Sequence, residues 1–119
     1  MKIAITAQNP SLESPVDTRF GRAAHFVVVD TESGDVSTVS NTQNLQAAQG
    51  AGIQAGRAVV ALGVKALITG HVGPKAFATL QAGGIDVYTT TAETVAQAIE
   101  QFKAGQLAPA AGADVEGHW

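Results

Sequence analysis

Residues 66–88, ALITGHVGPKAFATLQAGGIDVY, decide the fold because they predict a complete strand–helix–strand unit. Ala66–Thr69 and Ile85–Tyr88 are short apolar runs typical of buried strands. Between them, Gly73-Pro74 favours the start of a helix, since proline at the first helical position loses no intrahelical hydrogen bond. Gly83-Gly84 then ends that helix. This order predicts a right-handed crossover between two parallel strands.

Three more strands are predicted upstream of this unit. Lys2–Thr6, His25–Asp30 and Asp35–Ser40 are β-branched or alternating runs typical of strands. Glu32–Asp35 predicts a hairpin turn, in which Gly34 can take a positive φ at little cost. Three consecutive strands of this kind favour an antiparallel meander, to which the crossover strands are added.

Two further helices complete the predicted order. Apolar residues at helical spacing predict one helix from about Gly52 to Leu62 and a last helix that ends at Gly105. Thr90 and Glu93 have the spacing of a capping box ahead of the last helix. The domain is expected to span residues 1–107. The Ala- and Gly-rich tail, residues 108–119, is expected to be loosely held, although Trp119 could dock.

The resulting order is β-β-β-α-β-α-β-α, which predicts an α/β, ribonuclease-H-like fold with a mixed five-stranded sheet and helices on its faces. In this topology, four strands end at the same edge of the sheet. Ligands of open α/β sheets bind in the crevice at such an edge. The segments expected to meet there are residues 7–22, 41–52, 70–75 and 89–91.

Composition narrows the classes of function. The 119 residues carry a formal net charge of −3, with 45% hydrophobic and 14% charged residues, which is typical of one globular domain. Seven Lys and Arg are too few for the basic stripe that duplex nucleic acid usually needs. No apolar run approaches the ~20 residues of a membrane span and no leader pattern is present, so we expect a cytoplasmic protein without nucleic-acid or membrane partners. The chain has no cysteine, which excludes disulfides and thiolate metal ligands.

Four short motifs follow one another along the chain. They are R-F-G-R at 19–22, G-A-G at 50–52, G-x-x-G-P-K-A at 70–76 and G-I-x-V-Y at 84–88. Together they resemble the dinitrogenase iron–molybdenum cofactor biosynthesis family over residues 1–107. That family comprises NifX-like carriers, the carboxyl-terminal domain of NifB and small stand-alone relatives.

The resemblance implies a function without catalysis. Members of the family act as carriers or scaffolds for metal–sulfur clusters. The lack of cysteine and the TAQ sequence at 6–8 are most similar to the orange-protein subgroup, which holds a mixed molybdenum–copper sulfide cluster non-covalently. The resemblance therefore implies this anionic cluster as the cofactor, and a P-loop ATPase as a possible protein partner. The missing cysteine departs from those carriers that ligate through thiolates.

The first candidate site feature is Arg19-Phe20-Gly21-Arg22, a turn that enters a strand at the crevice. Guanidinium groups donate several weakly hydrated N–H groups, which suits a large sulfide anion. The alternative is an ordinary surface arginine pair, bonded to Asp17 or Asp30.

The second feature is the loop Gly70–Lys75, which leads into a helix start where backbone N–H groups and the helix dipole favour an anion. It lacks the G-K-[ST] ending of a phosphate loop. His71 is interpreted either as a ligand or as a loop residue with an ordinary hydrogen bond. A polar loop from Asn41 to Gly52 either closes over a ligand or only makes turns and caps. The predicted cofactor-binding residues are Arg19, Phe20, Gly21, Arg22, Asn41, Asn44, Gly50, Gly52, Gly70, His71, Gly73 and Lys75.

Two alternatives stay open beside the carrier hypothesis. A ribonuclease-H-like hydrolase is disfavoured, because Ile3–Thr6 and Ala66–Thr69 contain no acidic residue for a two-metal site. The G-x-S-x-G motif of a serine hydrolase is also missing. A protein-interaction module without a cofactor is possible, since a sheet edge and an Ala-rich helix can form a dimer. We accordingly expect a monomer or a weak homodimer.

Overall fold

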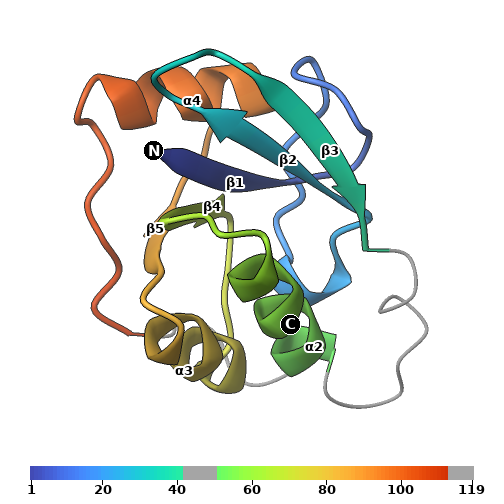
Figure 1. Cartoon of the computed structure of the whole chain (residues 1–119), viewed down its shortest axis with the longest axis vertical. Helices are drawn as coiled ribbons and strands as arrows, with labels where there is room; N and C mark the ends of the chain where they lie inside the picture. Colours follow the sequence, from blue (N-terminus) through green and yellow to red (C-terminus); the bar gives the residue numbers. More distant parts are fainter. Residues whose placement is uncertain (42–50, 113–119) are drawn as a thin grey trace.

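A mixed five-stranded sheet with helices on both faces forms the molecule (Figure 1). The structure is a computed structural model that describes residues 1–41 and 51–112. The strands are β1 (Lys2–Ala7), β2 (His25–Asp30), β3 (Val36–Ser40), β4 (Ala66–Thr69) and β5 (Asp86–Thr89). The helices are α2 (Ala51–Ala61), α3 (Pro74–Ala82) and α4 (Val95–Lys103), and η1 (Phe20–Arg22) is a single 3-10 turn.

The order of strands in the sheet is β3-β2-β1-β4-β5. β1 pairs antiparallel with β2, and β2 antiparallel with β3, which confirms the meander. β4 pairs parallel with β1, and β5 parallel with β4, which confirms the crossovers. The α/β class and the five-stranded mixed sheet are therefore as predicted. Six of the ten strand ends coincide with the predicted ones, and the other four differ by one residue.

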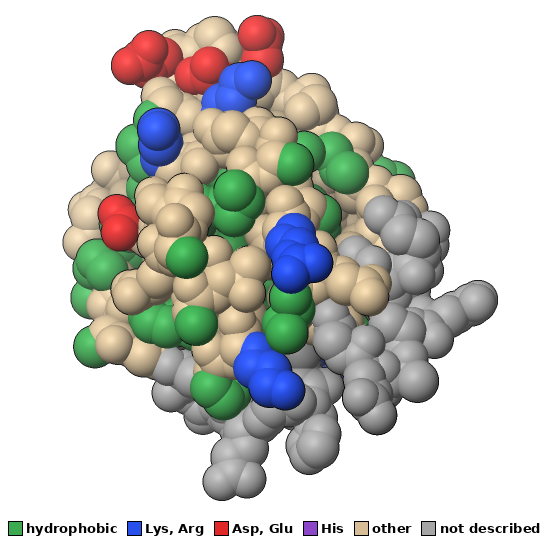
Figure 2. Space-filling model, turned by 60° about the horizontal axis from the view of Figure 1, so that its bottom comes forward, with side chains coloured by type: hydrophobic (Ala, Val, Ile, Leu, Met, Phe, Trp, Pro, Cys, Tyr) green, Lys and Arg blue, Asp and Glu red, His purple; other side chains and the backbone are tan. Residues whose placement is uncertain are grey.

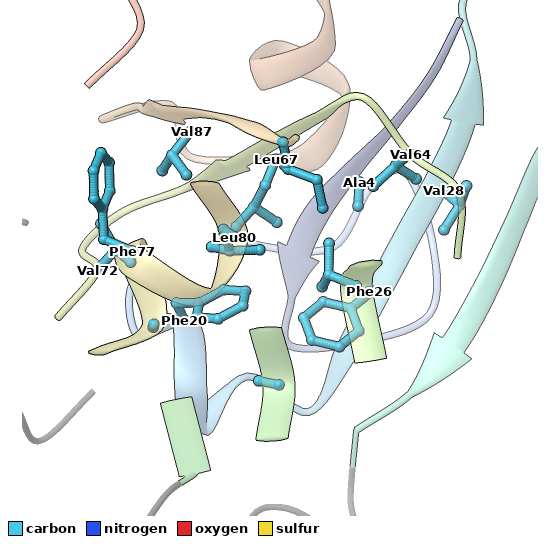
Figure 3. Close-up of a cluster of buried hydrophobic side chains, with 14 residues drawn as sticks. Ala4, Phe20, Phe26, Val28, Val64, Leu67, Val72, Phe77, Leu80 and Val87 are labelled. Atoms are coloured by element: carbon cyan, nitrogen blue, oxygen red, sulfur yellow. The ribbon is translucent and has the colours of Figure 1, made fainter. Parts of the chain in front are cut away.

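The hydrophobic core has two layers, because strand side chains alternate between the two faces of the sheet. Ile3 and Ile5 of the central strand β1 face α4, where they belong to a cluster with Val95 and Ile99. Ala4 points to the opposite face, where strand and loop residues pack with α2 and α3. Figure 3 shows this second cluster; its labelled members are Ala4, Phe20, Phe26, Val28, Val64, Leu67, Val72, Phe77, Leu80 and Val87.

Phe20 is the member of this cluster that connects the core to the predicted site. Its side chain is completely buried, and its ring centroid lies 6.0 Å from that of Phe26. Burying an aromatic side chain of this size contributes about 1.5–3 kcal/mol. The 3-10 turn η1 is therefore fixed to the core through Phe20, with α2 packed against it.

Turn residues explain where several elements end. The hairpin between β2 and β3 contains Gly34 with a φ of 79°, as predicted. Gly63 and Gly84, which follow α2 and α3, have φ of 75° and 77°. These are left-handed conformations that glycine adopts without steric cost.

The predicted cap of the last helix is wrong. Thr94, and not Thr90, is the N-cap of α4: its side chain accepts a hydrogen bond from the Gln97 N–H at 3.2 Å. The Gln97 side chain in turn accepts from the Glu93 N–H at 3.1 Å. This pair resembles a capping box that starts four positions after the predicted one, except that the bonded N–H belongs to the residue before the N-cap. Thr90 instead donates from its hydroxyl to the side-chain oxygen of Gln101 at 2.6 Å. This contact joins the loop before α4 to a residue eleven positions later, so local spacing cannot reveal it.

The first part of the tail is attached to the sheet, contrary to the expectation that it is loosely held. Pro109 forms an isolated bridge with Tyr88, and the Ala110 N–H donates to the Val87 carbonyl at 2.7 Å. Trp119 and His118 lie outside the described residues, as do Asn44 and Gly50. No helix within the described ranges is long and apolar enough to cross a membrane.

Candidate functional site

The candidate site lies at the edge of the sheet where β1, β3, β4 and β5 end and β2 begins. We call this edge the loop end, and define it by residues 8–24, 70–73 and 90–94. The opposite edge, with Met1 and residues 30–35, is called the hairpin end. The topology alone brings the predicted segments of the loop end together.

Two segments of the loop end run side by side. Arg19 and His71 form a parallel bridge, and the Phe20 N–H donates to the His71 carbonyl at 3.2 Å. Gly70 allows this approach, because a Cβ atom there would lie 2.7 Å from Thr18 Cα and 2.8 Å from Thr18 O. Only glycine fits at this position without moving the neighbouring backbone.

A buried hydroxyl pair supports these two segments from below. Thr6 and Thr69, which are adjacent in β1 and β4, are both completely buried. Thr6 Oγ1 donates to the Asp17 carbonyl at 2.7 Å and lies 2.9 Å from Thr69 Oγ1. The Asp17 N–H in turn donates to the Thr6 carbonyl at 3.0 Å. The chain just before η1 is thus attached to the central strands by buried hydrogen bonds.

The first hollow at the loop end, here named the arginine hollow, has a volume of about 400 Å³. Its side chain lining includes both predicted arginines. Arg19 Nε lies 3.9 Å from Asp17 Oδ1, and the backbone N–H of Arg19 donates to the same carboxylate oxygen at 3.0 Å. The Arg19 side chain is 50% exposed, so the ion pair leaves much of its guanidinium accessible to a ligand. The lining residues are Gln8, Asp17, Thr18, Arg19, Arg22 and Ala24.

A second hollow, here named the threonine hollow, has a volume of about 700 Å³ and shares Thr18 with the first. Its lining comes from the ends of β4 and β5, from α4 and from the segment after α4. The lining residues are Thr18, Gly70, His71, Thr89, Thr90, Thr91, Gln101, Gln106 and Leu107.

Comparison with known proteins now places this geometry in a family. The model of the dinitrogenase iron-molybdenum cofactor family matches residues 1–105. The chain belongs to this family. The match spans the whole sheet and every segment of the loop end.

Three relatives show how widely the fold is shared. The orange protein from Desulfovibrio gigas, solved in its apo form, is 45% identical, with 96% of each chain covered and a TM-score of 0.93. A putative NifB protein from Thermotoga is 39% identical, with 98% of each chain covered and a TM-score of 0.84. The uncharacterized protein MJ0580 of Methanocaldococcus jannaschii is 32% identical, over 90% of this chain and 89% of that protein. None of these three is named as an enzyme.

The structure brings some of the predicted binding residues together in this family member. Arg19 and Arg22 line the arginine hollow, and Gly70 and His71 line the threonine hollow beside it. Phe20 does not offer its side chain to a ligand, since its ring is in the core.

The remaining described residues lie around the hollows rather than in their lining. Asn41 is completely buried and donates from its side chain to the Ala23 carbonyl at 2.8 Å, so it fixes the end of β3. Gly73 is the N-cap of α3, with a φ of −83° that any residue can adopt. Lys75 is exposed in the first turn of that helix. Gly21 is buried in η1 and Gly52 lies in the first turn of α2.

Sequence reasoning missed most of the neutral polar lining. Gln101 and Gln106 reach the hollow from α4 and the segment that follows it, far along the chain from the other lining residues. The one available signal was the run Thr89–Thr91 at a strand end, which was assigned to the edge but not to the site. Gln8 and Thr18 were likewise within the expected segments without being singled out.

Charge is distributed unequally over the molecule. On the face that Figure 2 brings forward, acidic side chains lie at the top and on the left near mid-height, whereas basic side chains lie over both the upper and the lower parts of the described residues. At the hairpin end, backbone N–H groups of Glu32 and then Ser33 donate to Asp30 and lower the pKa of its carboxyl. Within residues 1–41 and 51–112, no group of three or more His, Asp and Glu is placed to hold a metal ion.

Proposed function

We propose that this chain binds an anionic metal–sulfur cluster non-covalently in the arginine hollow, and carries it without catalysing a reaction. The single observation that supports this most is the placement of Arg19 and Arg22 around one hollow at the loop end. Membership of the iron-molybdenum cofactor family supports the class of ligand.

The chemistry of the hollow suits an anion that brings its own sulfides. The chain has no cysteine, so the protein supplies donors, shape and positive potential instead of thiolate ligands. Guanidinium groups make charge-assisted hydrogen bonds worth about 1.5–3 kcal/mol each. Lys75, exposed at the start of α3, adds positive charge near the same edge.

The identity of the cluster is proposed from similarity. The orange protein of Desulfovibrio gigas is 45% identical over 96% of this chain. The resemblance to the orange-protein subgroup implies a molybdenum–copper sulfide cluster as the ligand. We extend that cluster, a cytoplasmic location and a possible P-loop ATPase partner to this chain. From the same similarity, we also propose that the fold is ribonuclease-H-like and that the domain ends at residue 107.

Reconstitution with tetrathiomolybdate and a copper salt tests the proposal. After desalting, the wild-type protein should keep a visible absorption band and bound molybdenum. Arg19→Gln/Arg22→Gln should lower the affinity by about a hundredfold or more, because two charge-assisted contacts are lost.

A matched control separates local contacts from overall charge. Lys2→Gln/Lys65→Gln also removes two positive charges, but from residues outside the loop end. Both lysines are exposed and lie towards the hairpin end, Lys2 at the start of β1 and Lys65 just before β4. This control should reconstitute like the wild type. Equal retention by a folded arginine double variant would contradict the site, and a wild-type protein that stays colourless would contradict the carrier function.

A protein-interaction module is the second candidate function, and β3 is the observation that favours it. This strand is an outermost strand of the sheet, with a neighbour on one side only, and four of its five residues are exposed. Exposed edge strands can pair with another chain. A concentration-dependent dimer that binds no cluster would favour this candidate over the carrier.

A further inference from the structure

The threonine hollow differs from the arginine hollow in the chemistry of its lining. None of its nine lining residues is Lys, Arg, Asp or Glu, and seven of them are Thr, His or Gln. The lining therefore offers neutral hydrogen-bonding groups and no carboxylate. A metal cation or an ammonium group would find no counter-charge among these side chains.

Gln101 is held in an orientation that leaves its donors available. Its side-chain oxygen accepts from the Thr90 hydroxyl at 2.6 Å, and the Thr90 hydroxyl accepts from the Ala92 N–H at 3.0 Å. Because the oxygen is engaged by Thr90, the two N–H groups of the amide are the part of Gln101 that remains for a ligand. A ligand that accepts hydrogen bonds is thus preferred over one that donates them.

The position of the hollow favours a negative ligand. Thr18 lines both hollows, and Arg19, the next residue, forms a bridge with His71. The carboxylate of Asp17, on the other side of Thr18, is paired with Arg19 at 3.9 Å, so that Arg22 is the second positive charge of the adjoining hollow. The positive potential of the arginines extends over such short distances with little screening. Donors arrive from several segments, because the lining comes from the loop before η1, the ends of β4 and β5, and α4. This arrangement suits a ligand with acceptor atoms in several directions.

We propose that the threonine hollow binds a small tetrahedral oxyanion, such as molybdate, beside the cluster and separately from it. The inference deepens the proposed function by giving a mononuclear anion its own place next to the arginine hollow. Charge-assisted hydrogen bonds to such a dianion are stronger than bonds between neutral groups, so neutral donors are sufficient.

Titration of the isotopically labelled full chain with sodium molybdate tests this, with the ionic strength held constant by sodium chloride. Saturable amide shifts are expected at Thr89–Thr91 and at the side-chain amide of Gln101. Sulfate and phosphate are titrated in parallel arms. Comparable binding of all three supports a general tetrahedral oxyanion site, and preferential binding of molybdate identifies the metal oxyanion. Shifts centred on Gln8 and Arg22, or no saturation with any of the three, would overturn the proposal.

Two glutamines of α4 provide a matched pair of variants. Gln101→Glu keeps an acceptor for Thr90 but replaces the amide donors by a carboxylate, and should weaken molybdate binding by about tenfold or more. Gln97→Glu makes the same charge change on an exposed residue of the same helix that does not line the hollow, and should change binding less than about twofold. Equal losses in both would show a long-range charge effect and overturn the site.

A further variant keeps the test valid if Gln101→Glu does not fold. Thr91 is exposed, so Thr91→Val removes a lining hydroxyl with little effect on the fold, and molybdate binding should still weaken severalfold.

The experiments distinguish failure of the oxyanion site from failure of the carrier function. Loss of the cluster in Arg19→Gln/Arg22→Gln, with weakened but still saturable shifts at Thr89–Thr91, would support both sites, whereas a colourless wild type that binds molybdate would contradict only the carrier.

Discussion

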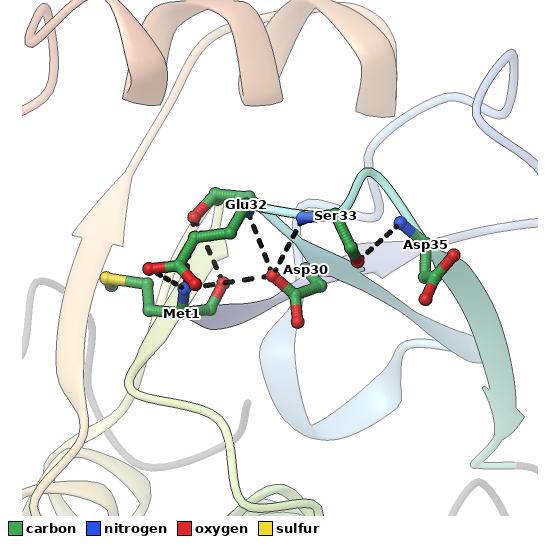
Figure 4. A network of polar contacts seen from close by, with 6 residues as sticks. Met1, Asp30, Glu32, Ser33 and Asp35 are labelled. Atoms are coloured by element: carbon green, nitrogen blue, oxygen red, sulfur yellow. Dashed lines mark hydrogen bonds and ion pairs between the residues drawn. The ribbon is translucent and has the colours of Figure 1, made fainter.

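The two ends of the sheet satisfy their polar groups in different ways. At the hairpin end, the contacts are local in sequence or involve the chain terminus (Figure 4). Asp30 accepts from the Glu32 and Ser33 N–H groups at 2.9 and 3.3 Å, and the Met1 amino group lies 3.8 Å from both Asp30 and Glu32. At the loop end, the contacts join residues far apart in the chain, such as Thr6 with Thr69 and Phe20 with His71.

Because of this difference, the loop end is better suited to hold a ligand than the hairpin end. At the hairpin end, the partners of the carboxylates are N–H groups of the same turn and the Met1 amino group. The loop end is built by segments that approach through glycine and threonine, and hollows lined by arginines on one side and neutral donors on the other remain between them. The proposed anion site is therefore at the loop end, whereas an anion would meet acidic groups at the hairpin end.

Two glycines give the largest expected contrast between the ends. Gly70→Ala should cost about 3 kcal/mol of unfolding free energy, since the new methyl group would overlap the Thr18 backbone. Gly34→Ala has nothing within 4 Å and costs only the left-handed conformation, about 1 kcal/mol. Chemical denaturation of both variants measures the difference. Equal costs would mean that the close approach at Gly70 relaxes without strain.

Two threonines give an intermediate contrast. Thr6→Val should destabilise the protein by about 2 kcal/mol, because the buried Asp17 carbonyl loses its hydroxyl donor. Thr31→Val removes an exposed hydroxyl bond to the Met1 carbonyl at 3.1 Å, and should change the unfolding free energy by less than about 0.5 kcal/mol. The double variant Thr6→Val/Thr69→Val should cost less than the sum of its single changes, since the two hydroxyls share one contact. Additive costs would contradict that coupling.

The smallest expected effect is the pH dependence from Asp30. Backbone N–H groups lower the pKa of this carboxyl below that of the unfolded chain, which is about 3.9. The ionised form therefore stabilises the fold above that pH, and the contribution is lost as the pH falls through the folded-state pKa. Thermal unfolding should separate wild type from Asp30→Asn at neutral pH, and the gap should close near pH 2. A gap that widens towards acid would contradict this sign.

Features that depend on neighbouring residues could be predicted from the sequence. The period of the strands, the turn at Gly34 and the proline that opens α3 are all local, and each is present in the structure. The arginines could also be assigned to the correct edge, because strand order follows from the crossovers.

Features that depend on long-range packing could not be predicted from the sequence. Thr90 matched a capping box by spacing, but its hydroxyl is engaged by Gln101 eleven positions later and Thr94 caps the helix instead. Phe20 belongs to a binding motif by sequence, yet the core needs its ring. The neutral lining of the threonine hollow, with Gln101 and Gln106, becomes visible only once α4 is placed on the sheet.

An anomalous difference map at the molybdenum edge, from crystals of protein reconstituted with tetrathiomolybdate and copper, tests the central claim most directly. The claim is that the loop end is the anion-binding end. We predict the main peak inside the arginine hollow, within reach of the guanidinium groups of Arg19 and Arg22. Coloured crystals with the main peak at the hairpin end, or on the outer surfaces of α2 and α3, would contradict it.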